Sequence, residues 1–426
     1  MSPRRSVSTL AVVALLVLAG CASGPAGQSS NPTASPTSGT DESQGATATP
    51  TAPDGPGTPN VSSSVTIDDT VTVENGTLPV DATPAFNRVE ALTGTDIDPW
   101  SVRVRNLSEW RSGLQRVGAI PLNRALGFEN VSTDWSEPTG ITTHGTVYIH
   151  PGNGSPAETE RVLAHEYAHV VQYRTAMLPW RGRLSQSELT TDRINARRSL
   201  VEGGAVFVAD AYAEEYPDIR TNSAYARALY RNGSATTRSA LAPYVFGSQY
   251  VESRIDDPAN LSVAYENYPR TTEQVIHNET PTEEPPANLT VTVEPADDSG
   301  WERARADTLG EMTTRATLET ELDRERAATA AAGWGNDRLV SFQHTTNESR
   351  YGWAWVIRPD NESETDDLET ALSSFAEARE GNSSLAFRVD TIDTETAALV
   401  FGDPDFVEGT AVAGTDGNVT VTPSPD

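Results

Sequence analysis

The stretch Arg161-Val-Leu-Ala-His165-Glu166-Tyr-Ala-His169-Val-Val171 places two histidines four residues apart, with a glutamate directly after the first. Positions i and i+4 of an α-helix lie on one face, one turn apart. Two imidazoles on that face can bind one Zn²⁺ at about 2.0–2.1 Å each. Glu166 would lie beside the metal without binding it, where it can accept a proton from a metal-activated water. The stretch therefore predicts a helix that carries a metal site.

The residues that flank this stretch also favour a helix. Ser155-Pro156-Ala157-Glu158 is typical of a capping box with proline at the first helical position. No glycine or proline follows before Pro179. The alternative is a helix with two histidines by chance. Against it, the chain has only six histidines, and two of them have the metal-binding spacing around a glutamate.

A catalytic zinc site needs a third protein ligand, and the candidate is Glu202 in Val201-Glu202-Gly203-Gly204. The residues from Thr191 to Tyr216 are otherwise typical of one long helix. Each glycine in the middle of a helix costs about 1 kcal/mol relative to alanine. Close approach to another helix or to a metal would explain why two glycines follow Glu202. Two histidines and one carboxylate, with a water in the fourth position, form a known catalytic zinc set.

The paired motif His165-Glu166-Tyr-Ala-His169 and Glu202-Gly-Gly-Ala resembles the gluzincin branch of zinc metallopeptidases, the thermolysin-like clan. The resemblance covers about residues 145–251. It implies a zincin-like fold, with His165, His169 and Glu202 as zinc ligands and Glu166 as general base. In one respect the sequence departs from this clan. An aspartate often follows the ligand glutamate by four residues and orients a ligand histidine, but this position is Val206, and Asp210 comes one turn later.

Residues beyond the glutamate helix supply candidates for stabilising an oxyanion during catalysis. In this chemistry a tyrosine or histidine can donate a hydrogen bond to the tetrahedral intermediate. Tyr250 and His277 are the predicted catalytic residues of this kind, and Tyr244 is a further candidate. The alternative for the tyrosines is that their rings pack in the core.

The segment Tyr268-Pro-Arg270-Thr-Thr-Glu273-Gln-Val-Ile-His277 resembles an element of prokaryotic HExxH proteins. The resemblance implies that the catalytic module extends to about residue 280. The roles of Arg270, Glu273 and His277 stay open. These residues either bind substrate or hold the C-terminal end of the module through charge-assisted hydrogen bonds.

The N-terminal residues 1–21 predict export. Arg4 and Arg5 precede an apolar run too short for a stable membrane span. The run ends in Leu18-Ala-Gly-Cys21, which resembles a lipobox, so Cys21, the only cysteine, is predicted to carry lipid. The alternative is a signal peptide with an incidental cysteine.

Residues 22–60 are rich in Ser, Thr, Pro and Gly and predict a disordered stalk. The expected location is the cell surface, with a lipid anchor in the outer face of the cytoplasmic membrane.

Charge composition predicts the environment of the protein. The net charge is −29, and every basic side chain is arginine, because the sequence contains no lysine. This balance resembles that of proteins from halophilic archaea. Multimolar salt shortens the Debye length to about 3 Å or less, so repulsion between surface charges is largely screened. The acidic balance argues against nucleic-acid binding.

The expected fold class is α+β. Residues 61–280 are predicted to form a mainly helical zincin-like module with a small sheet, in which residues 142–150 form one strand. A connector (281–300), an α+β domain (301–413) and a loose polar tail (414–426) are expected to follow. Within the C-terminal domain, residues 301–332 are predicted to be helical.

Three classes of function remain open at this point. The first is a membrane-anchored extracellular zinc metallopeptidase that hydrolyses a peptide or protein substrate, with Zn²⁺ as cofactor. The second is a zinc-binding surface or scaffold lipoprotein without turnover. The third is a structural envelope protein in which the motif is accidental. Bound zinc separates the first two classes from the third, and hydrolysis that depends on Glu166 separates the first from the second.

Overall fold

The structure is a computed structural model that describes residues 70–107, 118–129, 136–143, 145–180, 189–216, 218–294 and 299–424. The predicted signal segment, the lipidation site Cys21 and the predicted stalk lie outside the described residues. All described residues belong to one compact unit. Among them, no helix combines the length and the apolar character that a membrane span requires.

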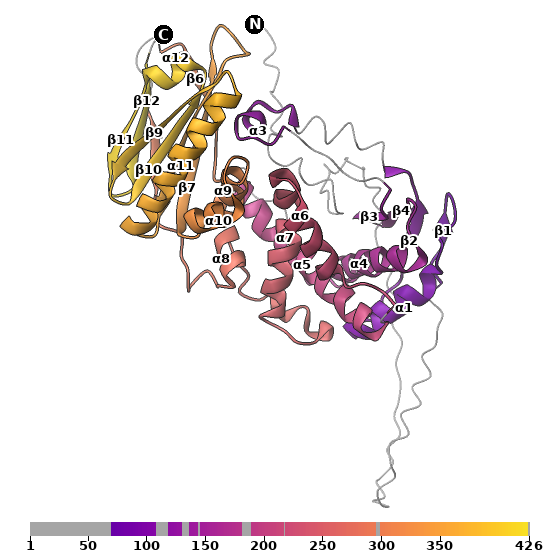
Figure 1. The fold of residues 1–426 in the computed structure, drawn as a ribbon. Helices are drawn as coiled ribbons and strands as arrows, with labels where there is room; N and C mark the ends of the chain where they lie inside the picture. Colours follow the sequence, from indigo (N-terminus) through magenta and orange to yellow (C-terminus); the bar gives the residue numbers. More distant parts are fainter. Residues whose placement is uncertain are drawn as a thin grey trace, which may run out of the picture. The chain divides into compact units, whose positions relative to one another are not determined.

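The first part of the described chain is mainly helical and has one small sheet (Figure 1). Its elements are β1 (Val73–Glu74), α1 (Ala82–Thr93), β2 (Ser101–Val104), α3 (Pro121–Ala125), β3 (Thr139–Thr143), β4 (Thr146–His150), α4 (Pro156–Arg174), α5 (Thr191–Glu215), α6 (Asn222–Asn232), α7 (Ala235–Glu252), the 3₁₀ turns η3 (Pro258–Asn260) and η4 (Val263–Tyr265), and α8 (Thr272–His277).

The second part mixes strands and helices. Its elements are β5 (Thr290–Val293), β6 (Trp301–Asp307), α9 (Gly310–Leu318), α10 (Arg324–Ala331), β7 (Trp334–His344), β8 (Tyr351–Pro359), α11 (Glu362–Asn382), β9 (Ala386–Asp393), β10 (Thr396–Gly402), α12 (Pro404–Gly409), β11 (Thr410–Thr415) and β12 (Asn418–Pro423). The chain is therefore a mixed α+β protein, as the sequence predicted.

The small sheet has the strand order β1-β2-β4-β3, and β3 pairs antiparallel with β4 at its edge. The prediction of one strand over residues 142–150 is wrong, because two strands form a hairpin there. Gly145 has a φ of +88°, which glycine adopts without strain, and it lies between the two strands. As a result β3 is the edge strand of the sheet, and it packs against helix α4.

Helices α5 and α7 cross at two glycines. A Cβ atom on Gly203 would lie 2.2 Å from the backbone carbon of Gly247, and a Cβ on Gly247 would lie 2.0 Å from the carbonyl oxygen of Ser199. Only glycine lets the two backbones approach so closely. This contact accounts for the first of the two glycines that follow Glu202.

We expect Gly203→Ala to lower the free energy of unfolding by about 1–3 kcal/mol or more, because the added methyl group overlaps the α7 backbone. The matched control is Gly381→Ala in helix α11, where an added Cβ meets no atom within 4 Å. That substitution should raise stability by about 0.5–1 kcal/mol. Chemical denaturation of both variants in high salt measures the difference. An unchanged or raised stability for Gly203→Ala would contradict the observed packing.

The five-stranded sheet of the second part has the order β6-β7-β8-β10-β9, and its central strands β7, β8 and β10 are mostly buried on both faces. Helices α10 and α11 pack on one face through a cluster that includes Trp355, Leu372 and Phe375. On the other face, Phe406 of α12 and Val421 of β12 pack against Phe342. Strand β12 belongs to a three-stranded sheet with the order β11-β12-β5.

Two predictions for this part are wrong. Residues 301–332 are not one helical region, because Trp301–Asp307 pairs with β7 as strand β6 before helices α9 and α10 begin. The residues from 414 onward are not a loose tail, because β12 buries Val419 and Val421. Hydrogen bonds to distant strands order both segments, which local composition did not reveal. The expected connector contains strand β5, which pairs in parallel with β12.

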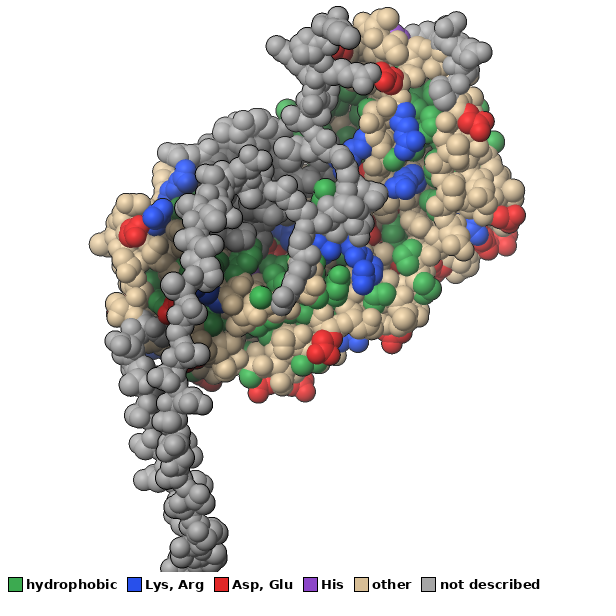
Figure 2. All heavy atoms as spheres, turned by 180° about the vertical axis from the view of Figure 1, so that it is seen from behind, with side chains coloured by type: hydrophobic (Ala, Val, Ile, Leu, Met, Phe, Trp, Pro, Cys, Tyr) green, Lys and Arg blue, Asp and Glu red, His purple; other side chains and the backbone are tan. Residues whose placement is uncertain are grey.

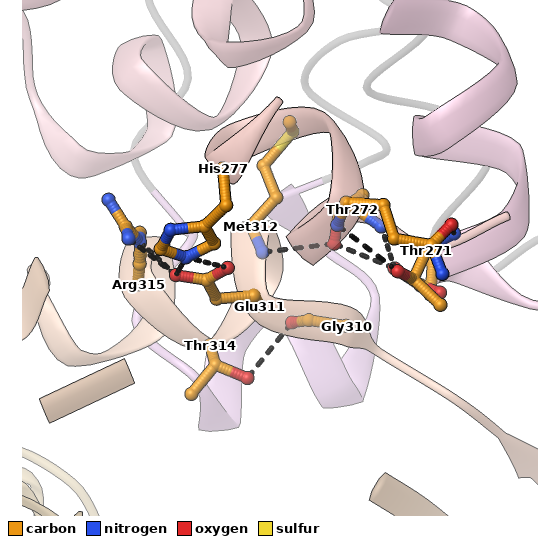
Figure 3. A network of polar contacts seen from close by, with 10 residues as sticks. Thr271, Thr272, His277, Gly310, Glu311, Met312, Thr314 and Arg315 are labelled. Carbon is orange, nitrogen blue, oxygen red and sulfur yellow. Dashed lines mark hydrogen bonds and ion pairs between the residues drawn. The ribbon is translucent and has the colours of Figure 1, made fainter. Parts of the chain in front are cut away.

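Buried hydrogen bonds join helices α5, α8 and α9. The carboxylate of Asp192 accepts hydrogen bonds from the backbone N–H and the hydroxyl of Thr272, at 2.7 and 2.6 Å. The same hydroxyl oxygen accepts a hydrogen bond from the backbone N–H of Met312 (Figure 3). The predicted catalytic module is thus connected to the second part of the chain by specific polar contacts as well as by packing.

One face of the molecule shows how some of its charged side chains are distributed (Figure 2). On the face in Figure 2, acidic side chains lie at separate places rather than in one cluster, and arginine side chains lie between some of them. The negative charge that this face shows therefore forms no single patch among the described residues.

Candidate metal centre

Helix α4 forms as its flanking residues predict. The hydroxyl of Ser155 accepts a hydrogen bond from the backbone N–H of Glu158, and the Glu158 carboxylate accepts one from the backbone N–H of Ser155. This capping box, with Pro156 at the first helical position, is confirmed. The helix continues through His165, Glu166 and His169, which are at most 5% exposed. All three side chains are therefore held in a buried environment.

Helix α5 brings Glu202 to the two histidines. The Oε2 atom of Glu202 lies 3.3 Å from Nε2 of His165 and 3.4 Å from Nε2 of His169. Neither Nε2 atom makes a hydrogen bond of good geometry. The same is true of both carboxylate oxygens of Glu202. Three ligand atoms at about 2.0–2.1 Å from a tetrahedral zinc ion would lie about 3.3–3.4 Å from one another. The distances from the Glu202 oxygen to the two imidazole nitrogens thus match the ligand separations of a zinc site, and all three ligand atoms lie within 4.8 Å of one another.

A glutamine orients the second histidine. The Oε1 atom of Gln172 lies 2.8 Å from Nδ1 of His169, while its Nε2 donates to the carbonyl of Val201 and to the hydroxyl of Tyr265, each at 2.8 Å. These two donations fix the amide so that its oxygen faces His169. In its neutral form the histidine then carries its proton on Nδ1, which leaves the Nε2 lone pair available to a metal. Gly204 makes room for the network, because a Cβ there would lie 2.1 Å from the Tyr265 hydroxyl oxygen.

The first histidine is held from a different element. Asn222, at the start of α6, has its side-chain amide 3.0 Å from Nδ1 of His165. Asp210 accepts a hydrogen bond from the backbone N–H of Ser223 at 3.0 Å and thereby secures the start of α6. The aspartate one turn after Val206 thus acts on His165 indirectly. The atom of Asn222 that faces Nδ1 is its amide nitrogen, so the neutral ring of His165 would carry its proton on Nε2. A half-turn of the amide, which brings its oxygen to Nδ1, would move that proton to Nδ1 and leave the Nε2 lone pair available to a metal.

Glu166 points at the edge strand β3. Its Oε2 accepts a hydrogen bond from the hydroxyl of Thr142 at 2.6 Å. A Cβ atom at Gly140 would lie 2.5 Å from Cγ of Glu166, so the missing side chain makes space for the glutamate. The carboxylate therefore lies between helix α4 and strand β3, beside the predicted ligands and not among them.

Burial is the largest single influence on the pKa of His165, Glu166, His169 and Glu202. It raises the pKa of Glu166 to about 7 against the opposing effects of His169 and Thr142. Burial also lowers the pKa of His165. In His169 and Glu202 their mutual attraction outweighs burial, so the pKa of His169 rises to about 9 and that of Glu202 falls well below its usual range. Metal binding must displace the proton from His169, since only neutral imidazole binds a metal.

Two further side chains line the site. The Nε atom of Arg198, one turn before Glu202, lies 3.8 Å from Oε1 of that carboxylate. The ring of Tyr244 from α7 stacks on the His165 ring with 5.8 Å between centroids, and the Arg198 guanidinium lies 5.7 Å from the same tyrosine ring. The Tyr244 hydroxyl is buried and has no hydrogen-bond partner. Of the three oxyanion candidates, Tyr244 is therefore the one that contacts a predicted ligand.

The other two candidates have different partners. Tyr250 is buried in the core, with the guanidinium of Arg254 at 4.8 Å from its ring centroid. His277 closes α8, and its Nε2 lies 3.1 Å from Oε2 of Glu311, which also pairs with Arg315 (Figure 3). Among the described residues, neither Tyr250 nor His277 makes a hydrogen bond, ion pair or ring contact with His165 or His169. The structure therefore places them as core and junction residues, and their predicted catalytic role has no support from these contacts.

Sequence reasoning missed several residues of the site. Gln172 lies three residues after His169 and Arg198 four residues before Glu202, so helical spacing could have identified both. Thr142 and Asn222 had no such signal, because a hairpin and a separate helix bring them to the site.

Comparisons with known proteins give one match. A family described as "Domain of unknown function (DUF8575)" matches residues 296–426, from just before β6 to the end of the chain. No curated protein and no solved structure matches. The matched residues lie outside the helices that carry the histidines and Glu202, so the function of this site must be argued from its geometry.

Proposed function

We propose that the protein is a zinc metallopeptidase of the gluzincin type, which hydrolyses peptide bonds in a peptide or protein substrate. His165, His169 and Glu202 would hold the metal. The observation that carries the proposal is the convergence of two unpartnered Nε2 atoms on one carboxylate oxygen, at 3.3 and 3.4 Å in a buried site. Without a metal, only the attraction between the protonated His169 and the Glu202 carboxylate offsets the burial of these atoms, whereas a metal would satisfy all three at once.

The donor set favours zinc among the common metals. Two imidazoles and one carboxylate suit zinc, whereas calcium and magnesium prefer sites made of oxygen atoms. When bound, zinc would polarise a carbonyl and lower the pKa of a water to about 7. The orientation of His169 by Gln172 agrees with this assignment, since ligand histidines almost always donate their second N–H to an acceptor.

The other residues of the site have roles that follow from their positions. Glu166 would accept the proton of the attacking water and pass it to the leaving amine, with Thr142 keeping its carboxylate in place. The hydroxyl of Tyr244 would donate a hydrogen bond to the oxyanion, because it is buried beside His165 and has no other partner. Arg198 would balance the negative charge of Glu202.

A second candidate function is a zinc-binding surface protein without turnover. The burial of His165, Glu166, His169 and Glu202 favours it, because each is at most 5% exposed and a substrate must reach the site. For either function we propose export and a lipid anchor at Cys21, from the apolar run and the lipobox-like residues before it.

The deciding measurement is hydrolysis of an unstructured peptide by the purified chain in high salt, at several zinc contents set by chelation and re-addition. Activity that rises with bound zinc to about one equivalent supports the peptidase. Stoichiometric zinc without hydrolysis favours the scaffold function. A chain that binds no zinc contradicts both proposals.

A further inference from the structure

A second group of charged side chains lies at the junction between the helical part and the matched family region. Glu273 comes from α8, Glu284 from the segment between α8 and β5, and Asp360 from the turn between β8 and α11. One carboxylate oxygen of each lies within 4.8 Å of the others. Three elements distant in sequence therefore direct acidic groups at one point.

Glu273 is the unusual member of this group. Its side chain is 2% exposed, and its Oε2 atom has no hydrogen-bond partner. A buried carboxylate without a donor or a positive partner is strongly unfavourable in its ionised form. Sequence analysis left its role open between substrate binding and hydrogen bonding to the rest of the chain. The structure gives its unpartnered oxygen neither a hydrogen bond nor an ion pair among the described residues.

The surrounding charges do not compensate for this burial. After burial itself, the strongest influences on the pKa of Glu273 are four other acidic groups, and the pKa rises to about 10. The pKa of Asp360 rises to about 6, again through burial and acidic neighbours. Only Glu284 has a positive group, His277, among its main influences, and the Nε2 of that histidine is paired with Glu311.

We propose that Glu273, Glu284 and Asp360 bind a hard divalent cation of the calcium class, which links α8 to the turn before α11. Calcium takes six to eight oxygen ligands at about 2.3–2.6 Å, so two oxygens on one ion can lie up to about 5 Å apart. The observed spacing satisfies this limit. Flexible coordination also suits a group in which one ligand is buried and Asp360 is exposed, since water can complete the shell.

The test is thermal unfolding of the full chain with and without 5 mM CaCl₂, after a chelator and dialysis have removed bound metal. This calcium concentration is about ten times a Kd on the order of 10⁻⁴–10⁻³ M, which is typical of weak calcium sites. Calcium should raise the Tm by about 3 °C or more in the wild type. It should do the same in Glu202→Ala, which lacks a zinc ligand, so that this result does not depend on the peptidase proposal. Glu266→Gln, an exposed acidic position in the helical part, is the matched control and should keep the full shift.

Glu273→Gln should abolish the calcium shift and weaken calcium binding at least tenfold by titration calorimetry. Without calcium, this variant should be at least as stable as the wild type, because glutamine is buried without the proton uptake that the raised pKa of Glu273 requires on folding. Asp360→Asn provides the same test if Glu273→Gln does not fold. Two results would overturn the proposal. The first is a wild-type Tm that calcium does not change, which would mean that the carboxyl groups stay protonated instead. The second is a calcium-induced rise in Tm that is undiminished in both Glu273→Gln and Asp360→Asn.

Discussion

Glu166→Gln should reduce peptide hydrolysis at least about 100-fold while the chain still binds about one equivalent of zinc. A positioned general base typically contributes a factor of about 10²–10⁴ to the rate. The amide keeps the shape of the side chain and an oxygen that can accept the hydrogen bond from Thr142, but it cannot accept a proton from water. Zinc should stay bound, because Glu166 faces β3 and is not one of the three converging ligands.

The measurements are initial rates on an unstructured peptide and zinc content by elemental mass spectrometry, on the same preparations. Glu214→Gln is the matched control, since Glu214 is an exposed acidic residue on helix α5 and should leave both values unchanged. Retention of more than half of the wild-type activity would exclude Glu166 as the base. Loss of zinc together with activity would show that Glu166 is itself a ligand.

Helix α4 shows which features of the site local sequence could predict. Its first turn is specified by Ser155, Pro156 and Glu158, and its histidines share a face because their spacing is one helical turn. The two glycines after Glu202 also indicated from the sequence that another part of the molecule approaches helix α5 closely. Gly203 admits the backbone of α7 and Gly204 admits the hydroxyl of Tyr265. The expected approach of another helix at this point is therefore confirmed.

The features that local sequence did not predict depend on distant contacts. The residues from Trp301 to Ala306 include several good helix formers, yet they form strand β6 because β7 offers a pairing partner. The turn at Asp416 and Gly417, both with positive φ, is a strong hairpin signal, and with it β11 and β12 could have been found. In contrast, nothing near His165 in the sequence indicates Asn222, which lies 57 residues away.

Dependence on distant contacts also explains why the sequence did not show which tyrosine of α7 lies beside the histidines. Tyr244 and Tyr250 both lie on α7, six residues apart, so they face different sides of the helix. Only the packing of α7 against α5 decides which of them meets the histidines. The close contact of Gly247 with Ser199 fixes that packing, and it directs Tyr244 to His165 and Tyr250 into the core.

Glu202→Ala should lower zinc affinity at least tenfold relative to the wild type. The substitution removes the carboxylate on which both histidines converge and leaves two protein ligands, too few for a stable catalytic zinc site. It also leaves Arg198 buried without its acidic neighbour, so repulsion from the guanidinium adds to the loss. Competition with a zinc-binding dye gives the affinity, and zinc per chain after dialysis gives an independent value.

Two further variants separate loss of a ligand from loss of fold. Glu202→Gln preserves the volume of the side chain and offers only a neutral amide oxygen, so it should bind zinc more weakly than the wild type. Without metal it should still fold cooperatively, at a lower unfolding temperature than the wild type, because the amide does not attract the protonated His169. Glu214→Ala, at an exposed position on the same helix, should bind zinc as the wild type does. Equal zinc affinity in the wild type and Glu202→Ala would exclude Glu202 as the third ligand. The peptidase proposal would then lose the contact on which it depends, because two histidines on one helix do not by themselves form a catalytic centre.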